Sequence, residues 1–257
     1  MIDIHSHILY GVDDGAQSLE DSLEMARVAA ADGIHTIVAT PHGIEWSTDC
    51  NWPETVGRVK SLQDELNRLS IELKIAPGLE VYLTPGLAKQ IDEGSAFPLN
   101  GSRYILVEMP MNLFPIYAEQ AIFELQLKGL IPILAHPERN AGIQKDYRLL
   151  QKLVDRGVLG QVTAASLCGS FGSRTKETAR VLLQRNLVHI IASDAHSPQG
   201  HRAPILSAGL AEAASLVGVE RANAMVTAIP EAILADRDII VEPPVELKPR
   251  TWSFWRK

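Results

Sequence analysis

The chain alternates short, almost uninterrupted apolar runs with longer stretches in which apolar residues recur every three or four positions. Continuous apolar runs are typical of parallel strands covered on both faces, and the longer spacing is typical of helices that bury one face. Seven such runs predict seven strands, at residues 1–4, 36–39, 71–79, 104–107, 131–135, 159–163 and 188–192. The repeated strand-then-helix order favours an α/β fold. A seven-stranded (β/α) barrel is the first interpretation, and an open doubly wound sheet is the second.

Helix boundary signals agree with this alternation. Ser18 and Asp21 have the spacing of a capping box at the start of a helix, and Gly33 follows the last apolar position of the same helix. Gly129 and Gly157 end two later helices in the same way, each just before a predicted strand. The sequence therefore predicts one β/α unit after another, without an internal repeat.

The character of the chain changes after about residue 236. Pro243, Pro244 and Pro249 interrupt any regular element, and the final residues 252–257 are mostly aromatic or basic. We therefore predict a single barrel domain over residues 1–236 and a C-terminal tail over residues 237–257. The tail is expected to pack over the body of the domain or to be partly disordered. A docking role toward a partner or a membrane surface is the alternative.

Composition excludes several classes of function. The net charge of −7 argues against a nucleic-acid-binding protein, because such proteins usually present a basic face. The first residues do not combine a basic segment with an apolar one, so no signal peptide is expected. Cys50 and Cys168, the two cysteines, lie far apart and lack metal-binding spacing. These features predict a soluble cytoplasmic protein.

Residues able to bind metals recur where the predicted strands, or the loops after them, end. Parallel strands that alternate with helices point their carboxyl ends to one face, so these side chains should converge. Imidazoles and carboxylates without thiolates favour manganese, iron or zinc as the bound ion. The nine candidate ligands are His5, His7, Asp14, His42, Glu80, Glu108, His136, Asp194 and His196.

Each of these residues, taken alone, has a structural explanation at least as good as a functional one. His5 and His7 face the same way if they continue a strand, but two polar residues at a strand end are common. A single carboxylate at such a place is often only a hydrogen-bonded cap. The metal hypothesis therefore depends on the whole set, spread from residue 5 to residue 196.

The same segments resemble the polymerase-and-histidinol-phosphatase (PHP) superfamily and, within it, the bacterial capsule and exopolysaccharide protein-tyrosine phosphatases. The resemblance covers roughly the first 200 residues, in order. Its specificity for the tyrosine-phosphatase branch depends on the Gly-Val-Asp-Asp-Gly loop and the His-Pro-Glu-Arg segment. The matching segments are residues 3–7, 11–15, 39–42, 78–80, 106–108, 135–139 and 193–196.

This resemblance implies a distorted seven-stranded barrel with three divalent ions, manganese first, with iron, cobalt or zinc as alternatives. By similarity, one ion is held by His5, His7, Glu80 and Asp194, a second by Glu80, Glu108 and His136, and a third by Asp14, His42 and His196. Such ions lower the pKa of a bridging water and neutralise phosphoryl oxygens.

Two arginines also resemble residues of the family that hold phosphate or its transition state, since a guanidinium suits two phosphoryl oxygens at once. They are Arg139, three residues after His136, and Arg202, six residues after His196. A surface ion pair is the alternative for either arginine. His201 is either a general acid or an exposed loop histidine.

The predicted function is therefore metal-dependent hydrolysis of phosphotyrosine, with a tyrosine autokinase of polysaccharide assembly as the expected partner. Homo-oligomerisation is left open. Another PHP phosphoesterase, either a histidinol phosphatase or a nuclease, and a non-catalytic scaffold that binds a kinase are the alternatives. Cys168 and Arg174 also have the C-x5-R spacing of cysteine-dependent phosphatases, a short pattern that arises easily by chance.

Overall fold

The computed structural model describes residues 1–43 and 51–246, and within these ranges eight short strands form two sheets. The first sheet has the order β1 (Ile2–Ser6), β2 (Thr36–Ala39) and β3 (Lys74–Pro77). The second has the order β4 (Glu80–Tyr82), β5 (Tyr104–Glu108), β6 (Ile131–Ala135), β7 (Leu159–Thr163) and β8 (Ile190–Ala192). Every pairing of these strands is parallel.

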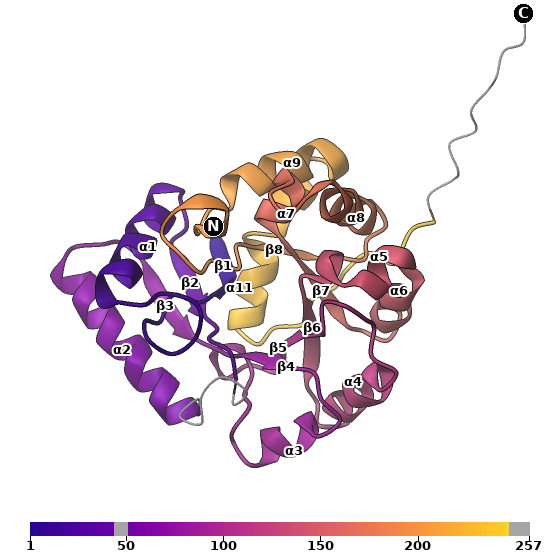
Figure 1. Cartoon of the computed structure of the whole chain (residues 1–257), viewed down its shortest axis with the longest axis horizontal. Coiled ribbons are helices and arrows are strands. Elements are labelled where there is room, and N and C mark those ends of the chain that lie inside the picture. Colours follow the sequence, from indigo (N-terminus) through magenta and orange to yellow (C-terminus); the bar gives the residue numbers. More distant parts are fainter. Residues whose placement is uncertain (44–50, 247–257) are drawn as a thin grey trace, which may run out of the picture.

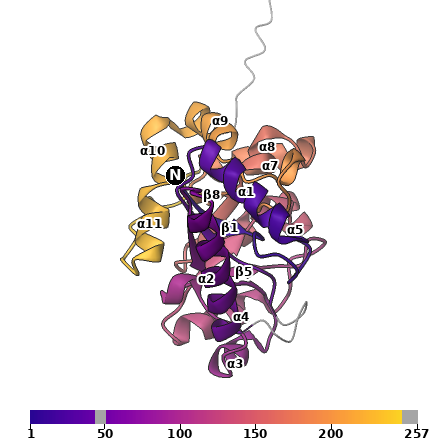
Figure 2. The ribbon, with the colours of Figure 1, turned by 90° about the vertical axis from the view of Figure 1, so that its left-hand side faces the viewer.

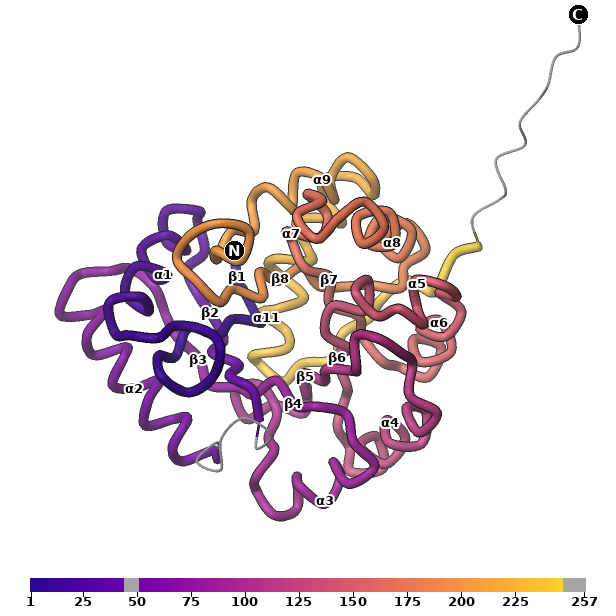
Figure 3. The backbone as a smooth tube through the Cα atoms, in the orientation of Figure 1, coloured from indigo at the N-terminus to yellow at the C-terminus, as the bar shows by residue number. Residues whose placement is uncertain are grey.

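Two isolated bridges join the sheets into a ring. Ser6 pairs with Ala195, just beyond β8, and His42, beyond β2, pairs with Glu80 at the start of β4. Figure 3 shows the chain running once around the molecule, from indigo through magenta to orange, until the orange segment returns beside β1. The expected α/β architecture with parallel strands is confirmed. The return of the chain to β1 does not fit the open doubly wound alternative.

The count of seven strands is not confirmed, because the apolar run 71–79 does not form one strand. It contributes β3 to one sheet and leads into β4 of the other. The strand is interrupted at Gly78, which packs so closely that an added Cβ would lie 2.8 Å from both Leu99 Cδ2 and Val38 Cγ1. Buried apolar residues lie on both sides of this interruption, so periodicity alone does not reveal it.

Helices cover the outside of the ring (Figure 1). The helices in the described ranges are α1 (Leu19–Ala31), α2 (Trp52–Arg68), α3 (Leu87–Asp92), α4 (Ala118–Leu127), α5 (Ala141–Lys145), α6 (Arg148–Val154), α7 (Ala164–Cys168), α8 (Ser173–Gln184), α9 (Ser207–Val217), α10 (Val219–Ala224) and α11 (Ala228–Leu234). None of these helices is both long and apolar enough to cross a lipid bilayer. Short 3-10 turns are η1 (Leu99–Gly101), η2 (Pro137–Arg139) and η3 (Gly200–Arg202).

The predicted helix boundaries are confirmed for α1. Ser18 accepts a hydrogen bond from the Asp21 amide, and the Asp21 side chain accepts one from the Ser18 amide, which together form a capping box. Gly33 takes a φ of 85° just after the helix, a left-handed conformation that glycine adopts without strain. This sharp stop directs the chain into β2.

An apolar cluster fills the inside of the ring, and α11 closes one end of it. Alternate residues of the strands point inward, among them Tyr104 and Leu106 of β5, and Ile233 of α11 packs against the same cluster. In Figure 2, α10 and α11 lie to the left of the strands, and the indigo segment that follows β1 lies to the right. The opposite end of the ring is therefore the end at which the loops after the strands gather.

The described part of the predicted tail, residues 237–246, packs on the body of the protein. The Tyr104 hydroxyl donates to the Arg237 carbonyl at 2.6 Å, and the Val245 amide donates to the Arg185 carbonyl at 2.9 Å. Residues 247–257, which include the aromatic and basic residues of interest, lie outside the described ranges. The division into a domain and a tail stays a prediction.

The carboxylate of Asp3 connects β1 with the segment after β8. It is fully buried, and it accepts hydrogen bonds from the Ser193 amide at 3.0 Å, the Ser193 hydroxyl at 2.5 Å and the His5 amide at 3.3 Å. The two bonds with Ser193 fasten β1 to the segment after β8, across the closing point of the ring. The two segments that they join both carry candidate ligands.

We predict that Asp3→Ala lowers the free energy of unfolding by about 3 kcal/mol or more, because it leaves several buried donors without an acceptor. Asp3→Asn keeps one oxygen in place and should lose less. Urea unfolding followed by circular dichroism, with a chelator present so that metal binding does not contribute, measures the difference. An Asp3→Ala protein as stable as the wild type would contradict this role.

Candidate metal centre

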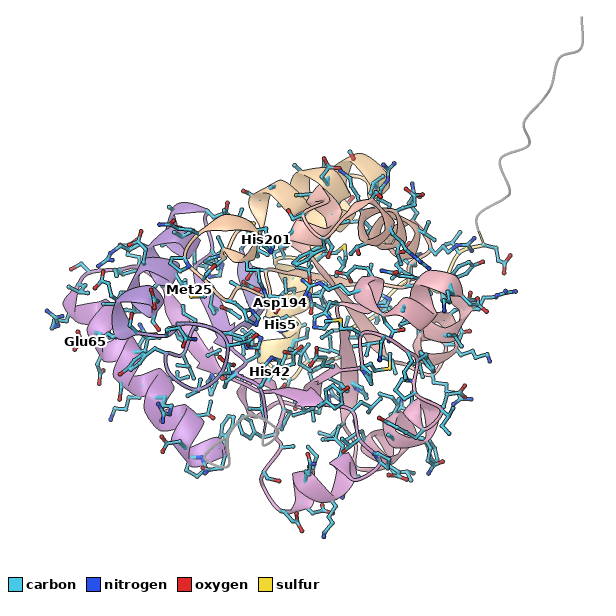
Figure 4. The ribbon with its side chains drawn as sticks, viewed as in Figure 1. His5, Met25, His42, Glu65, Asp194 and His201 are labelled. Carbon is cyan, nitrogen blue, oxygen red and sulfur yellow. The ribbon has the colours of Figure 1, made fainter. Side chains whose placement is uncertain are left out.

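The nine candidate ligands converge at the end of the ring where the strand loops gather. Figure 4 places His5, His42 and Asp194 together in the middle of the molecule, whereas Glu65 of α2 lies at its edge. A cavity of about 450 Å³ opens onto this cluster. Its walls are formed by Asp14, His42, Glu80, Tyr82, Glu108, Met111, His136, Arg139, Asp194, His196 and Arg202.

The inward-pointing rows of the strands explain part of this convergence. Tyr104 and Leu106 belong to the inner apolar cluster, and Glu108 is the next residue of the same alternating series. Ile190 and Ala192 point inward from β8, and Asp194 follows two residues beyond the strand. Each of these apolar rows therefore ends in a carboxylate on the inner side of the ring.

The first predicted ligand group is compact and buried. The Nε2 atom of His5 lies 3.3 Å from His7 Nε2, from Glu80 Oε2 and from Asp194 Oδ1. Nitrogen and oxygen ligands about 2.1 Å from one ion lie about 3.0–3.4 Å from each other. His5 Nε2 thus lies at the spacing that ligands of one divalent ion require from each of the other three donors, and His7 Nε2 lies 3.3 Å from Glu80 Oε2 and 3.6 Å from Asp194 Oδ1.

The second and third groups adjoin the first. His136 Nε2 lies 3.1 Å from Glu80 Oε1 and 3.8 Å from Glu108 Oε1, so that Glu80 presents one oxygen to each of the first two groups. In the third group, Asp14 Oδ1 lies 3.2 Å from His196 Nε2 and 3.5 Å from His42 Nε2. All nine residues are thus brought together as expected, and their roles as ligands stay a prediction.

Charge supports a cation at the centre. Glu80 and Asp194 are only 1% and 2% exposed, and burial disfavours their charged forms. Nevertheless, nearby positive groups, His5 above all, hold the pKa of both carboxyls well below the usual range. Burial also opposes protonation of His7, but hydrogen bonds with Asp13 and Glu80 raise its pKa to about 10. The donor set attracts positive charge and contains no thiolate, so it fits divalent ions.

Two of the candidate ligands have a left-handed backbone. His136, directly after β6, has a φ of 32°, and Asp194, two residues after β8, has a φ of 52°. Side-chain-bearing residues rarely adopt this conformation, which persists only where the surrounding structure imposes it. Here it turns each side chain toward the cluster at the point where the strand ends.

Side chains that the sequence reasoning did not assign orient the candidate ligands. Asp13 Oδ2 lies 2.7 Å from His7 Nδ1, and Gln161 Oε1 lies 2.9 Å from His5 Nδ1. Each acceptor leaves Nε2 of its histidine directed at the other donors, an arrangement that metal-binding histidines usually show. Gly15 allows the Asp13 loop to pack against His7, because an added Cβ there would collide with the His7 backbone.

The two predicted arginines both reach the cavity. Arg139 donates from Nη1 to Asp194 at 2.7 Å and from Nη2 to Thr163 Oγ1 at 3.1 Å, and its guanidinium carbon lies 3.9 Å from the Phe171 ring centroid. Arg202 Nη2 lies 2.9 Å from His196 Nε2 and 3.4 Å from the Asp194 carboxylate. Neither is a simple surface ion pair. Phe171, which the sequence did not single out, holds Arg139 from one side.

The remaining candidates lie apart from the cluster. The exposed His201 packs its ring edge-on against Phe171, with centroids 5.3 Å apart, and does not line the cavity as described. Cys168 ends α7, and burial followed by the charge of Glu212 raises the pKa of its thiol. A nucleophilic cysteine needs a lowered pKa, so the structure gives the cysteine mechanism no support.

Known proteins share both the sequence and the fold. Residues 1–235 match the family described as "Capsular polysaccharide synthesis, CpsB/CapC". The tyrosine-protein phosphatase YwqE of Bacillus subtilis is 42% identical over 201 residues, which cover 77% of this chain and 78% of YwqE. The putative tyrosine-protein phosphatase CapC of Staphylococcus aureus is 39% identical over 199 residues, which cover 77% of each chain.

One solved structure is similar to nearly the whole chain. It is one of the crystal structures of YwqE from Bacillus subtilis and CpsB from Streptococcus pneumoniae, which are described as unique metal-dependent tyrosine phosphatases. The two chains superpose with a TM-score of 0.91 at 37% sequence identity, covering 96% of this chain and all of the other. This chain therefore belongs to the CpsB/CapC family of capsular polysaccharide synthesis proteins.

Proposed function

We propose that this protein is a metal-dependent tyrosine-protein phosphatase. The observation that carries the proposal is the cluster of nine imidazole and carboxylate side chains, seven of which line the cavity beside two arginines. Family membership supports the same activity, since the relatives YwqE and CapC bear the name of tyrosine-protein phosphatases. The reaction is hydrolysis of a phosphate monoester.

The chain's own residues bind and orient the phosphate. Arg139 and Arg202 line the cavity wall. Each guanidinium carries five N–H donors, more than its contacts with Asp194, Thr163 or His196 use, so donors remain for phosphoryl oxygens, for which its planar fork is suited. Asp13 and Gln161 fix the rings of His7 and His5. Bound divalent ions supply positive charge and a lowered pKa for the attacking water.

The finer assignments follow the same reasoning. Three divalent ions occupy the three donor groups, with manganese as the first choice among ions that accept mixed imidazole and carboxylate ligands. The substrate is a phosphotyrosine-bearing protein, and a tyrosine kinase that controls capsule or exopolysaccharide synthesis is the proposed partner. Action on such a kinase places the protein in the cytoplasm. Assembly into a homo-oligomer is compatible with this proposal.

Metal removal should abolish activity. We expect a strong chelator to stop phosphate release from a phosphotyrosine peptide, and manganese or cobalt to restore it, because the ions supply both charge and nucleophile activation. Phosphate release measured beside metal content by mass spectrometry tests this. A fully demetallated enzyme that keeps its rate would overturn the proposal.

Two variants separate the metal mechanism from the cysteine mechanism. His136→Ala removes a ligand and should lower turnover by about two orders of magnitude or more. Cys168→Ser, outside the cavity, should stay within a few-fold of the wild type. The reverse result, an inactive Cys168→Ser protein with its metals still bound, would require a thiol nucleophile.

Arg139→Ala should separate phosphate binding from metal binding. Removing a donor that stabilises developing charge on an oxyanion is expected to lower kcat/KM about a hundredfold, with the metal content unchanged. Arg139→Lys should recover only part of the loss, because an ammonium lacks the planar fork. Steady-state kinetics on each variant, with its metal stoichiometry, measures both effects.

Two outcomes would change the assignment of Arg139. Loss of metal from Arg139→Ala would mean that the arginine holds Asp194 in place and has only a structural role. Retention of both metal and activity would move the phosphate contact to Arg202, where the same pair of measurements on Arg202→Ala would then apply.

A further inference from the structure

The loop between β5 and α4, residues 109–117, exposes large apolar side chains next to the metal cavity. Met111 lines the cavity and is 41% exposed, Leu113 is 48% exposed, and Ile116 is 102% exposed. Residues 109–117 contain no charged residue. Exposed apolar side chains scattered singly need no explanation, but a group of them beside an active site marks a surface for binding.

The backbone of this loop is held firmly by the segment that follows Arg139. The side-chain amide of Asn140 donates to the carbonyls of Pro110 and Leu113, both at 2.7 Å. The amide of Ala141 donates to the Met111 carbonyl at 2.8 Å. Asn140 is itself buried. The outward direction of Met111 and Leu113 is therefore fixed by buried hydrogen bonds.

The far end of the loop is fastened as well. The Tyr117 hydroxyl donates to the Leu83 carbonyl at 3.2 Å, and Phe114 packs partly against the core. Gly142 lets α5 approach this loop, since an added Cβ would lie 2.8 Å from Phe114 Cβ. The loop thus buries some of its apolar residues and holds the others outward.

We propose that Met111, Leu113 and Ile116 form an apolar shelf that contacts the residues flanking the phosphotyrosine of a substrate protein and selects apolar neighbours there. This inference rests on the proposed function, which places the phosphate in the metal cavity. Met111 belongs to both surfaces, so a chain whose phosphate enters the cavity passes over the shelf. Charged flanking residues would lose hydration there without gaining a partner.

A substrate segment fits the shelf better than a second copy of the chain does. A stable protein interface usually buries about 800 Å² on each partner, with some 20–30 residues a side. Three side chains at the edge of a cavity suit the few residues on either side of a phosphotyrosine. Because the shelf adjoins the cavity through Met111, the molecule that the cavity binds is also the one that reaches the shelf.

The test compares three substrates: free phosphotyrosine, a phosphotyrosine peptide flanked by leucines, and the same peptide flanked by serines. The double variant Leu113→Asp/Ile116→Asp should lower kcat/KM for the leucine-flanked peptide about tenfold, mainly through KM, the scale expected for lost apolar contacts. Hydrolysis of free phosphotyrosine should stay within about twofold, because neither residue lines the cavity. The wild type should prefer the leucine-flanked peptide, and the variant should lose that preference.

Leu127→Asp is the matched control. Leu127 is 71% exposed at the other end of α4, which spans Ala118–Leu127 and is about 15 Å long. This variant introduces the same charge on a leucine at a distance from the cavity, and it should treat all three substrates as the wild type does. Circular dichroism and metal content confirm that each variant is folded.

The remaining outcomes each overturn the shelf. Equal loss on all three substrates would make the loop a structural support for the cavity. A wild type indifferent to the flanking residues would show that the shelf selects nothing. A change in oligomeric state of the double variant, measured by light scattering, would assign the surface to a second copy. A wild type inactive on all three substrates would instead refute the phosphatase activity, and the shelf with it.

Discussion

The whole site depends on closure of the ring between its first strand and its last. His5 belongs to β1 and Asp194 follows β8, so two donors of one group come from opposite ends of the folded chain. The buried carboxylate of Asp3, bonded to Ser193, fastens these ends together. The entropy lost on closing a long loop grows only slowly with its length, so a few well-placed buried bonds suffice. Donor geometry is therefore a property of the complete ring and not of any single β/α unit.

The donor cluster also links protons, metals and folding. Buried carboxylates such as Glu80 are unfavourable unless positive charge lies beside them, and here the histidines provide it when they are protonated. A divalent ion needs the same histidines neutral, so its binding must release protons. Because an unfolded chain cannot assemble donors from separate strands, binding also stabilises the fold. The same residues thus serve both stability and chemistry. Protonated histidines balance the buried carboxylates when no ion is bound, and neutral histidines bind the ion when it is present.

Local patterns predicted most of the donor positions but few of their supports. Strand ends can be read from apolar runs, and alternation along a strand explains why Glu108 faces inward. The interruption between β3 and β4 at Gly78 escaped detection because buried apolar residues lie on both sides of it. The contacts of Gln161 with His5 and of Phe171 with Arg139 join segments that are distant in sequence, so no periodicity encodes them. The family resemblance identified the candidate site residues, but it did not identify the side chains that support them.

The way in which Asn140 holds the neighbouring loop affects how this protein can diversify. The two bonds from the Asn140 side chain and the one from the Ala141 amide all end on carbonyls of the loop backbone, and none uses the side chains of Met111 or Leu113. Substitutions at those outward positions leave the anchoring bonds, and therefore the placement of Arg139, intact. With the proposed role of the shelf, exchange of Leu113 or Ile116, which do not line the cavity as described, alters partner preference and leaves the chemical site in place. A lineage can acquire a new substrate by exchanging exposed side chains on a backbone held by hydrogen bonds that those side chains do not make.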